Sequence, residues 1–385
     1  MSEANIRRPF TAVLLVSFAA FIALGLGDGA LGVAWPSMQG EFARGVADLG
    51  LLITVGSLGY LTASFSYGWL HGRAGTGPLL VGGSSLMALG FVSIGVAPVW
   101  ALLVCSSLVL GFGGGLVDSG LNAHAALAFD VRSINLLHAC FGVGATLGPV
   151  IVTISLTASG VWRGGYVAIA FLQVVVLGAI WARRNGWQVS DDDDSVGSVV
   201  VARKRRSWYL FTLFFLYTGV EVATGQWAFS LLTESRGMST ASAGVWVAIY
   251  WGGLTVGRLL FGLVGNRVAP TRALGGSVLV AMTGLAILWV DPWGLGAFGL
   301  PIASLGLAAV FPTLISLTPS RIGRDRSTRS IGFQLGAASL GVAVIPWALG
   351  LVAESAGLEA LGPGLFLVSA LLALVHFVSA REARV

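Results

Sequence analysis

The chain has 385 residues, of which 56% are apolar and only 10% are charged, and its net charge is +5. A soluble domain could not bury so much apolar surface, so the composition excludes a soluble globular protein. It predicts an all-α membrane protein with many spans. The basic charge is expected to meet anionic lipid rather than nucleic acid. Cys105 and Cys140 lie in apolar surroundings and indicate neither a disulfide nor a metal site.

Twelve apolar runs are long enough to cross a bilayer, which takes about 20 residues. The first six lie near 10–34, 47–70, 78–97, 99–125, 134–158 and 164–182. The other six lie near 208–232, 242–264, 273–290, 294–318, 330–352 and 361–380. One long hydrophilic stretch separates the two sets, with aspartates at 191–194 and a basic run at 203–206. The sequence predicts an N-terminal bundle at 8–182, a charged cytoplasmic linker at 183–206 and a C-terminal bundle at 207–380.

The arginine and lysine residues predict the orientation of these helices. With both termini cytoplasmic, the outer segments hold only Arg44, Arg163 and Arg236, and the inner segments hold the rest. Cytoplasmic loops normally carry this excess. The first helix is too long for a removable signal peptide and lacks a small-residue cleavage site. We therefore expect an integral protein of a bacterial plasma membrane.

The two halves of the chain resemble each other. A shift of 194 residues aligns four positions of one half with four of the other. The aligned pairs are Gly50 with Gly244, Gly59 with Gly253, Gly68 with Gly262, and Arg73 with Arg267. The same shift brings Asp28 within one residue of Glu221. Parallel repeats of this kind place a substrate site near the midplane, between the halves.

Three acids lie inside predicted spans and are the candidates for proton coupling: Asp118, Asp28 and Glu221. An ionisable group at that depth normally faces a bundle interior or a water-filled cavity. Loss of water disfavours the charged form of a carboxyl group, so such a group can exchange a proton near neutral pH. A permanent structural pair between Asp118 and Asn122, four residues apart on one helical face, is the alternative.

Further polar and aromatic residues in the spans are candidates for substrate contact: Asn122, His138, Gln226, Trp227, Trp251 and Gln334. A sugar needs a few placed hydrogen-bonding groups for its hydroxyls and an aromatic face for its C–H groups. Each of these residues could instead make a structural contact inside the bundle. Arg258 is expected to pair at the interface between the bundles rather than to hold substrate.

The loops after the second and eighth helices resemble the major facilitator superfamily of secondary transporters. The first reads Gly68-Trp-Leu-His-Gly72-Arg73-Ala-Gly75, against the superfamily pattern G-x-x-x-D-R-x-G-R. The second copy keeps Gly262 and Arg267 but has Asn266 in place of the usual aspartate. The resemblance implies twelve helices in two six-helix bundles with pseudo-twofold symmetry. It also implies that these loops act as conformational switches, without the usual aspartate.

A narrower resemblance joins the chain to the fucose:proton symporter family and related bacterial glucose-type permeases. The segments that carry it begin at Asp28, Asp118, Asn135, Glu221 and Gly332. In that family an acid on helix one and another on helix four take part in proton coupling and sugar recognition. By position these acids correspond to Asp28 and Asp118.

The sequence therefore predicts a secondary active transporter that couples a proton gradient to symport of a small neutral polar solute such as a monosaccharide. Two alternatives remain: a proton-driven exporter of amphipathic compounds, and a non-transporting sensor or lipid-handling scaffold on the same fold. The sequence contains no phosphate-binding loop, metal cluster or nucleophile beside a base, so it does not predict an enzyme or a cofactor. A monomer in the lipid bilayer is expected.

Overall fold

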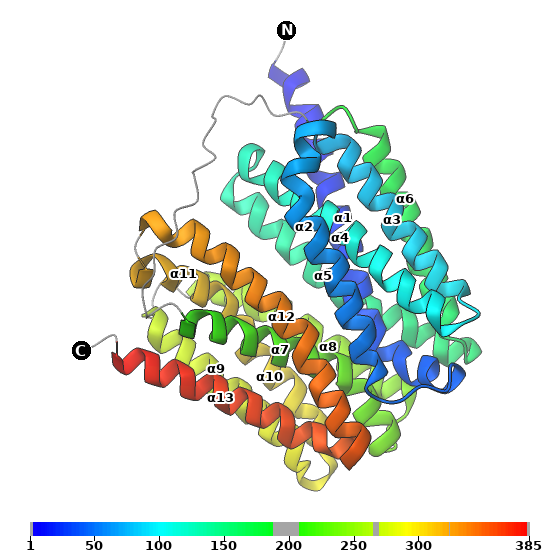
Figure 1. Cartoon of the computed structure of the whole chain (residues 1–385), viewed down its shortest axis with the longest axis vertical. Coiled ribbons are helices and arrows are strands. Elements are labelled where there is room, and N and C mark those ends of the chain that lie inside the picture. The colour runs from blue at the N-terminus through cyan, green and yellow to red at the C-terminus, as the bar shows by residue number, and fades with distance from the viewer. Residues whose placement is uncertain (1–2, 188–207, 265–268, 323, 383–385) are drawn as a thin grey trace.

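A computed structural model describes residues 3–187, 208–264, 269–322 and 324–382, and every regular element in this part of the chain is a helix (Figure 1). The first half contains α1 (Glu3–Glu41), α2 (Asp48–Ala74), α3 (Thr76–Val96), α4 (Trp100–Ala128), α5 (Val131–Ser159) and α6 (Arg163–Ala182). The second half contains α7 (Trp208–Ser230), η1 (Leu231–Ser235), α8 (Thr240–Val264), α9 (Pro270–Val290), η3 (Pro292–Gly294), η4 (Gly296–Phe298), α10 (Gly299–Ala308), α11 (Val310–Ile322), α12 (Arg324–Ala356), η5 (Leu358–Ala360) and α13 (Leu361–Glu382). Most of the predicted linker lies outside the described residues.

The twelve predicted helices are all present, with α10 and α11 together forming the tenth. Their shared span runs over Gly296–Thr318 and is interrupted at Ala309. Pro312, four residues after Ala308, has no backbone N–H to donate to the Ala308 carbonyl, which accounts for the break.

Eleven helices of the described chain are long and apolar enough to cross a membrane. The exception among the twelve predicted spans is α7, which carries Tyr217, Glu221 and Gln226 within its apolar sequence. These side chains lower its hydropathy, and they are buried against other helices rather than exposed to lipid. The helix is thus an interior one.

The helices form two groups, α1–α6 and α7–α13, which lie side by side in Figure 1. Within the first group α1 packs on α5, and α4 packs on both α2 and α3; within the second, α7 packs on α12, and α10 on α9. The two groups meet through α5 with α8, α2 with α12, and α1 with α7. Helices α3, α6, α9 and α13 pack mainly on helices of their own group.

At the same end of each group, an arginine and a glutamate join neighbouring helices, and the two residues exchange places between the groups. Arg163, at the start of α6, contacts Glu41 at the end of α1 and donates to the Ala97 carbonyl after α3. In the other group Arg236 follows α7, pairs with Glu359 before α13 at 2.9 Å, and donates to the Leu288 carbonyl of α9 at 2.7 Å. The two clusters occupy equivalent places with the charges exchanged. Each one ties three helices of its own group together.

The contacts between the two groups include hydrogen bonds at this same end, which is the predicted outer end. Glu354 of α12 accepts from the backbone N–H of Ala47 at 3.1 Å, and the Thr54 hydroxyl donates to the Ala343 carbonyl at 3.1 Å. Deeper along the helices, Gln226 donates to the Asp28 carbonyl at 2.7 Å. These hydrogen bonds therefore join the two groups of helices across the outer half of the protein.

Candidate functional site

Asp118 of α4 is held by donors from two helices. The Tyr60 hydroxyl of α2 donates to Asp118 Oδ2 at 2.5 Å, and Asn122 Nδ2 donates to Oδ1 at 3.0 Å. Asn122 also donates to the Asp118 carbonyl at 2.9 Å, because the two residues lie one helical turn apart. Both carboxylate oxygens are thus satisfied within the protein, and the contact between Asp118 and Asn122 that the structural alternative requires is present.

Asp28 lies near Asp118 but differs from it in exposure. Its side chain is exposed although it lies far from both ends of α1, and it is within electrostatic reach of Asp118. The backbone carbonyl of Asp28 accepts a hydrogen bond from Gln226 Nε2 of α7 at 2.7 Å. Gly32 follows Asp28 by one helical turn. A Cβ at Gly32 would lie only 2.6 Å from the Gln226 carbonyl oxygen, so α1 and α7 touch backbone to backbone here. The acid therefore lies at the crossing of the two groups.

Glu221 of α7 belongs to a separate cluster in the second group. It pairs with Arg258 of α8, whose Nη2 lies 3.1 Å from Oε1, and the Tyr217 hydroxyl donates to Oε2. Tyr250 donates to the Glu221 carbonyl at 2.7 Å. The Arg258 side chain is 34% exposed, against 12% for Glu221. Arg258 thus pairs with a residue of its own group.

His138 of α5 lies between these two clusters. Its side chain is exposed, and it is within electrostatic reach of both Asp118 and Arg258. Its ring packs edge-on against Phe21 at 5.5 Å. We call Asp28, Asp118, His138, Glu221 and Arg258 the central polar cluster. It contains uncompensated acids from the first group and a neutralised ion pair from the second.

Three other predicted contact residues are buried in helix packing. Trp227 is 1% exposed and donates to the Pro346 carbonyl of α12 at 3.0 Å. Trp251 is 6% exposed and covers Gly225 of α7. Gln334 accepts from Thr318 at 3.1 Å and is also buried. Gln226 keeps a buried Oε1 without a protein partner, so it retains one free acceptor.

The predicted switch loops are described only in part. Gly68 is exposed on α2, and Arg73 lies over the Trp69 ring at 3.8 Å. Gly262 lies in the last turns of α8. Asn266 and Arg267 lie outside the described residues.

Sequence reasoning missed Tyr60 and Tyr217, the tyrosines that hydrogen-bond Asp118 and Glu221. Tyr217 lies four residues before Glu221, so its spacing alone could have indicated the contact. Tyr60 could not be found in this way, because its bond to Asp118 depends on the packing of α2 against α4.

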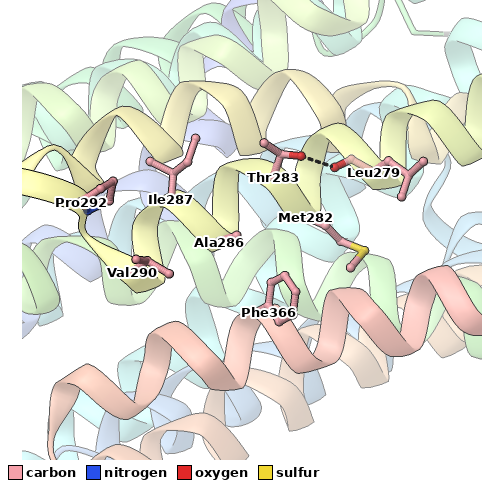
Figure 2. Close-up of a pocket in the computed structure, with 8 residues that line it drawn as sticks. All are labelled: Leu279, Met282, Thr283, Ala286, Ile287, Val290, Pro292 and Phe366. Atoms are coloured by element: carbon pink, nitrogen blue, oxygen red, sulfur yellow. Dashed lines mark hydrogen bonds between the residues drawn. The ribbon is translucent and has the colours of Figure 1, made fainter.

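A groove of about 490 Å³ lies apart from this cluster, between α9 and α13 (Figure 2). It is lined by Leu279, Met282, Thr283, Ala286, Ile287, Val290, Pro292 and Phe366. Thr283 supplies its one side-chain hydroxyl, which donates to the Leu279 carbonyl at 3.0 Å. These lining residues suit an apolar lipid chain rather than a polar solute.

Two groups of membrane-spanning helices with ionisable residues at their crossing define a secondary transporter. The chain belongs to the Major Facilitator Superfamily, whose family model matches residues 17–346. Proteins of this family are transporters rather than enzymes.

Two relatives are similar to this chain over most of its length. The chain is 22% identical to the yeast (Saccharomyces cerevisiae) protein "Bypass of stop codon protein 6", over 88% of this chain and 76% of that protein. It is 21% identical to the glucose/mannose transporter GlcP of Bacillus subtilis, over 87% of this chain and 86% of that transporter.

Solved structures share the fold. A mutant form of the nucleoside transporter NupG superposes with a TM-score of 0.81 at 12% identity, covering 96% of this chain and 99% of that chain. A mutant form of the fucose:proton symporter FucP of E. coli gives a TM-score of 0.65 at 19% identity, covering 97% of this chain and 98% of that chain. The expected fold and family resemblance are confirmed.

Proposed function

We propose that this transporter is a proton-coupled symporter of a small neutral polar solute such as a monosaccharide. The observation that carries the proposal is the uneven charge of the central polar cluster. Asp28 and Asp118 lie within electrostatic reach of each other, while Arg258 is already paired with Glu221. Two nearby carboxylates repel each other in a low-dielectric site, and binding a proton removes that repulsion.

The same charge distribution favours a neutral solute. An anionic solute would meet Asp28 and Asp118, whereas the nearby guanidinium of Arg258 is engaged by Glu221. A neutral polyhydroxy solute can use the groups at hand, namely Asn122 and the exposed Asp28 and His138. Similarity to a glucose/mannose transporter and to a fucose:proton symporter supports a sugar as that solute.

Alternating access would proceed by rocking of the groups 8–182 and 207–380 about the central polar cluster. The contacts from Ala47–Glu354 inward to Asp28–Gln226 would hold the outer side closed in the present state. Protonation of Asp118 would remove a charge that must otherwise cross a low-dielectric barrier. The carrier loaded with proton and solute could then rock, whereas a carrier that holds solute beside an unneutralised acid would stall.

Transport in proteoliposomes under an inward proton gradient tests this proposal. Labelled hexoses and pentoses are presented to the native protein and to Asp118→Asn. The Ser107→Ala variant is the control, because the Ser107 hydroxyl bonds only within α4, to the Leu103 carbonyl at 3.0 Å. We expect gradient-driven uptake to fail in Asp118→Asn while counterflow exchange survives. Flux of lipophilic cations without uptake of any sugar would instead support an exporter, and no flux of either would support a non-transporting protein.

A further inference from the structure

A line of hydroxyl groups continues from Asp118 along the contact between α2 and α4. Tyr60 donates to Asp118 Oδ2 at 2.5 Å, and the Ser64 side chain lies beside the Tyr60 hydroxyl, one turn further along α2. Ser119 of α4 donates to the Ser64 hydroxyl at 3.3 Å. Side chains from both helices thus place a row of hydroxyl oxygen atoms that begins at the acid.

Polar side chains continue from there toward the C-terminal end of α2. Tyr60, Ser64, Tyr67 and His71 follow one another at spacings of four, three and four residues, so they share one helical face. The Tyr67 ring packs on α4 at Gly120, the residue after Ser119, where a Cβ would lie 3.4 Å from the ring.

The last members of this face lie at the junction of α2 and α3. The Tyr67 hydroxyl is buried near Thr76 without a hydrogen-bond partner among the described residues, and His71 Nε2 lies 3.0 Å from the Thr76 hydroxyl. His71 is half-buried in the last turn of α2, which is the predicted cytoplasmic end. The polar face therefore runs from the middle of the first group to its inner surface.

We propose that this hydroxyl seam, made of Tyr60, Ser64, Ser119, Tyr67, Thr76 and His71, carries the proton of Asp118 to the cytoplasmic side. Proton and solute would then leave the transporter by separate routes. The proposal rests on the proposed function in one respect, namely that Asp118 is the proton site. Hydroxyl groups suit the task because each one donates and accepts a hydrogen bond at once.

The transfer balances without any other reactant. The Asp118 carboxyl O–H bond breaks as its proton bonds to the Tyr60 oxygen, and Tyr60 gives its own hydroxyl proton to Ser64 Oγ. Ser64 gives up its original proton in turn, each later member of the seam accepts one proton and releases one, and one proton reaches water on the inner side. One proton has left, each hydroxyl again holds one, and Asp118 is a carboxylate. The bond from Tyr60 to Asp118 Oδ2 has the direction expected of that product.

The competing exit for the proton is the exposed side of the central polar cluster. Asp118 faces Asp28 from α1, Tyr60 from α2, Asn122 on its own helix and His138 from α5. Asp28 and His138 are exposed, so either could deliver the proton directly to water. Of the remaining two, only Tyr60 can relay the proton onward through a second hydroxyl.

Time-resolved infrared spectroscopy after a pH jump separates these routes without any solute. The full-length protein is placed in proteoliposomes, and the Asp118 carboxyl band is assigned as the band absent from Asp118→Asn. Deprotonation rates are compared for the native protein, Tyr60→Phe, Ser64→Ala and His138→Gln. Tyr166→Phe and Ser107→Ala are matched controls, because Tyr166 packs among Phe91 and Trp162, and Ser107 bonds within α4.

We expect Ser64→Ala and Tyr60→Phe to slow deprotonation by about a hundredfold, the order that a positioned proton-transfer group contributes. Both controls should match the native rate, and His138→Gln should not reproduce this hundredfold slowing. Ser64 is the decisive position, because its hydroxyl lies beside Tyr60 and is not one of the donors to Asp118, so its loss leaves the carboxyl donors in place.

A native rate in Ser64→Ala, or slowing confined to His138→Gln, would refute the seam while leaving Asp118 as the proton site. If no band disappeared in Asp118→Asn, Asp118 itself would fail as the proton site. The two failures are thus told apart by the same spectra.

Discussion

The crossing of α1 and α7 at Gly32 offers a direct way to shift the transporter between states. A methyl group at this position would lie 2.6 Å from the Gln226 carbonyl oxygen and 2.8 Å from the Gln226 Cα. Backbone atoms of a helix cannot swing aside as a side chain can, so Gly32→Ala forces the two groups of helices apart where they touch. We expect this variant to disfavour the state closed at its outer side.

The size of the effect follows from the overlap. Overpacking a close contact costs about 1 to 3 kcal/mol. At about 1.4 kcal/mol per factor of ten, this shifts the equilibrium about 5-fold to 150-fold toward the outward-open state. The gain in helix propensity from glycine to alanine applies to both states and therefore cancels.

Distances between spin labels across the outer end measure this shift. Labels are attached to cysteines at the exposed positions Arg44 and Ser355, in a background without Cys105 and Cys140. Gly32→Ala should turn a minor long-distance population into a major one. Gly114→Ala is the control, because its methyl group would meet Leu24 Cδ2 at an ordinary 3.7 Å within the first group. An unchanged distance distribution in Gly32→Ala would refute the proposed contact.

Three further predictions concern charged side chains. Arg258→Gln leaves Glu221 unpaired and should lower the free energy of unfolding by about 2 kcal/mol. This is less than for a fully buried pair, because the Arg258 side chain is 34% exposed. Thermal melting should show recovered stability in the Arg258→Gln, Glu221→Gln double variant, and no recovery would argue against the pair. Glu359→Arg should lower the melting temperature, with about 1 kcal/mol at stake since Glu359 is 53% exposed, and the added change Arg236→Glu should restore it if the pair fastens the helices. Glu354→Ala removes the acceptor for the Ala47 N–H and should raise the long-distance spin-label population by less than tenfold, because Glu354 is exposed. The shift should be smaller than that of Gly32→Ala, and a larger one would contradict the prediction.

Hydropathy predicted the helices well because the bilayer fixes their length. The runs 78–97 and 164–182 correspond closely to α3 and α6, which pack mainly within their own group. The run 10–34 underestimated α1, because that helix continues through Gln39 to Glu41, whose carboxylate pairs with Arg163. Composition shows where an apolar run ends, whereas a tertiary ion pair can extend a helix beyond it.

The acids could be located from sequence, but their partners could not. A carboxyl group inside an apolar run stands out, as Asp28, Asp118 and Glu221 do. Whether it is paired depends on neighbouring helices, which a linear pattern does not contain. For the same reason Trp227 was predicted as a sugar platform, whereas in the structure its indole fills the space beside Gly350 and donates to Pro346. Its role in binding stays a prediction.

The two groups of helices contribute different charges to the central polar cluster, although their helices are arranged alike. At the outer end they are built as counterparts, with Glu41 and Arg163 in one group and Arg236 and Glu359 in the other. At the centre the second group holds a self-neutralised pair, Glu221 with Arg258, so its charge need not change as it moves.

The first group instead holds Asp28 and Asp118 near each other, so its charge depends on how many protons it carries. A scaffold fastened alike on both sides can rock as two stiff bodies. A titratable charge on only one of them then makes the cost of rocking depend on protonation. Under the proposed function, this asymmetry is what would couple proton binding to the movement of a neutral solute.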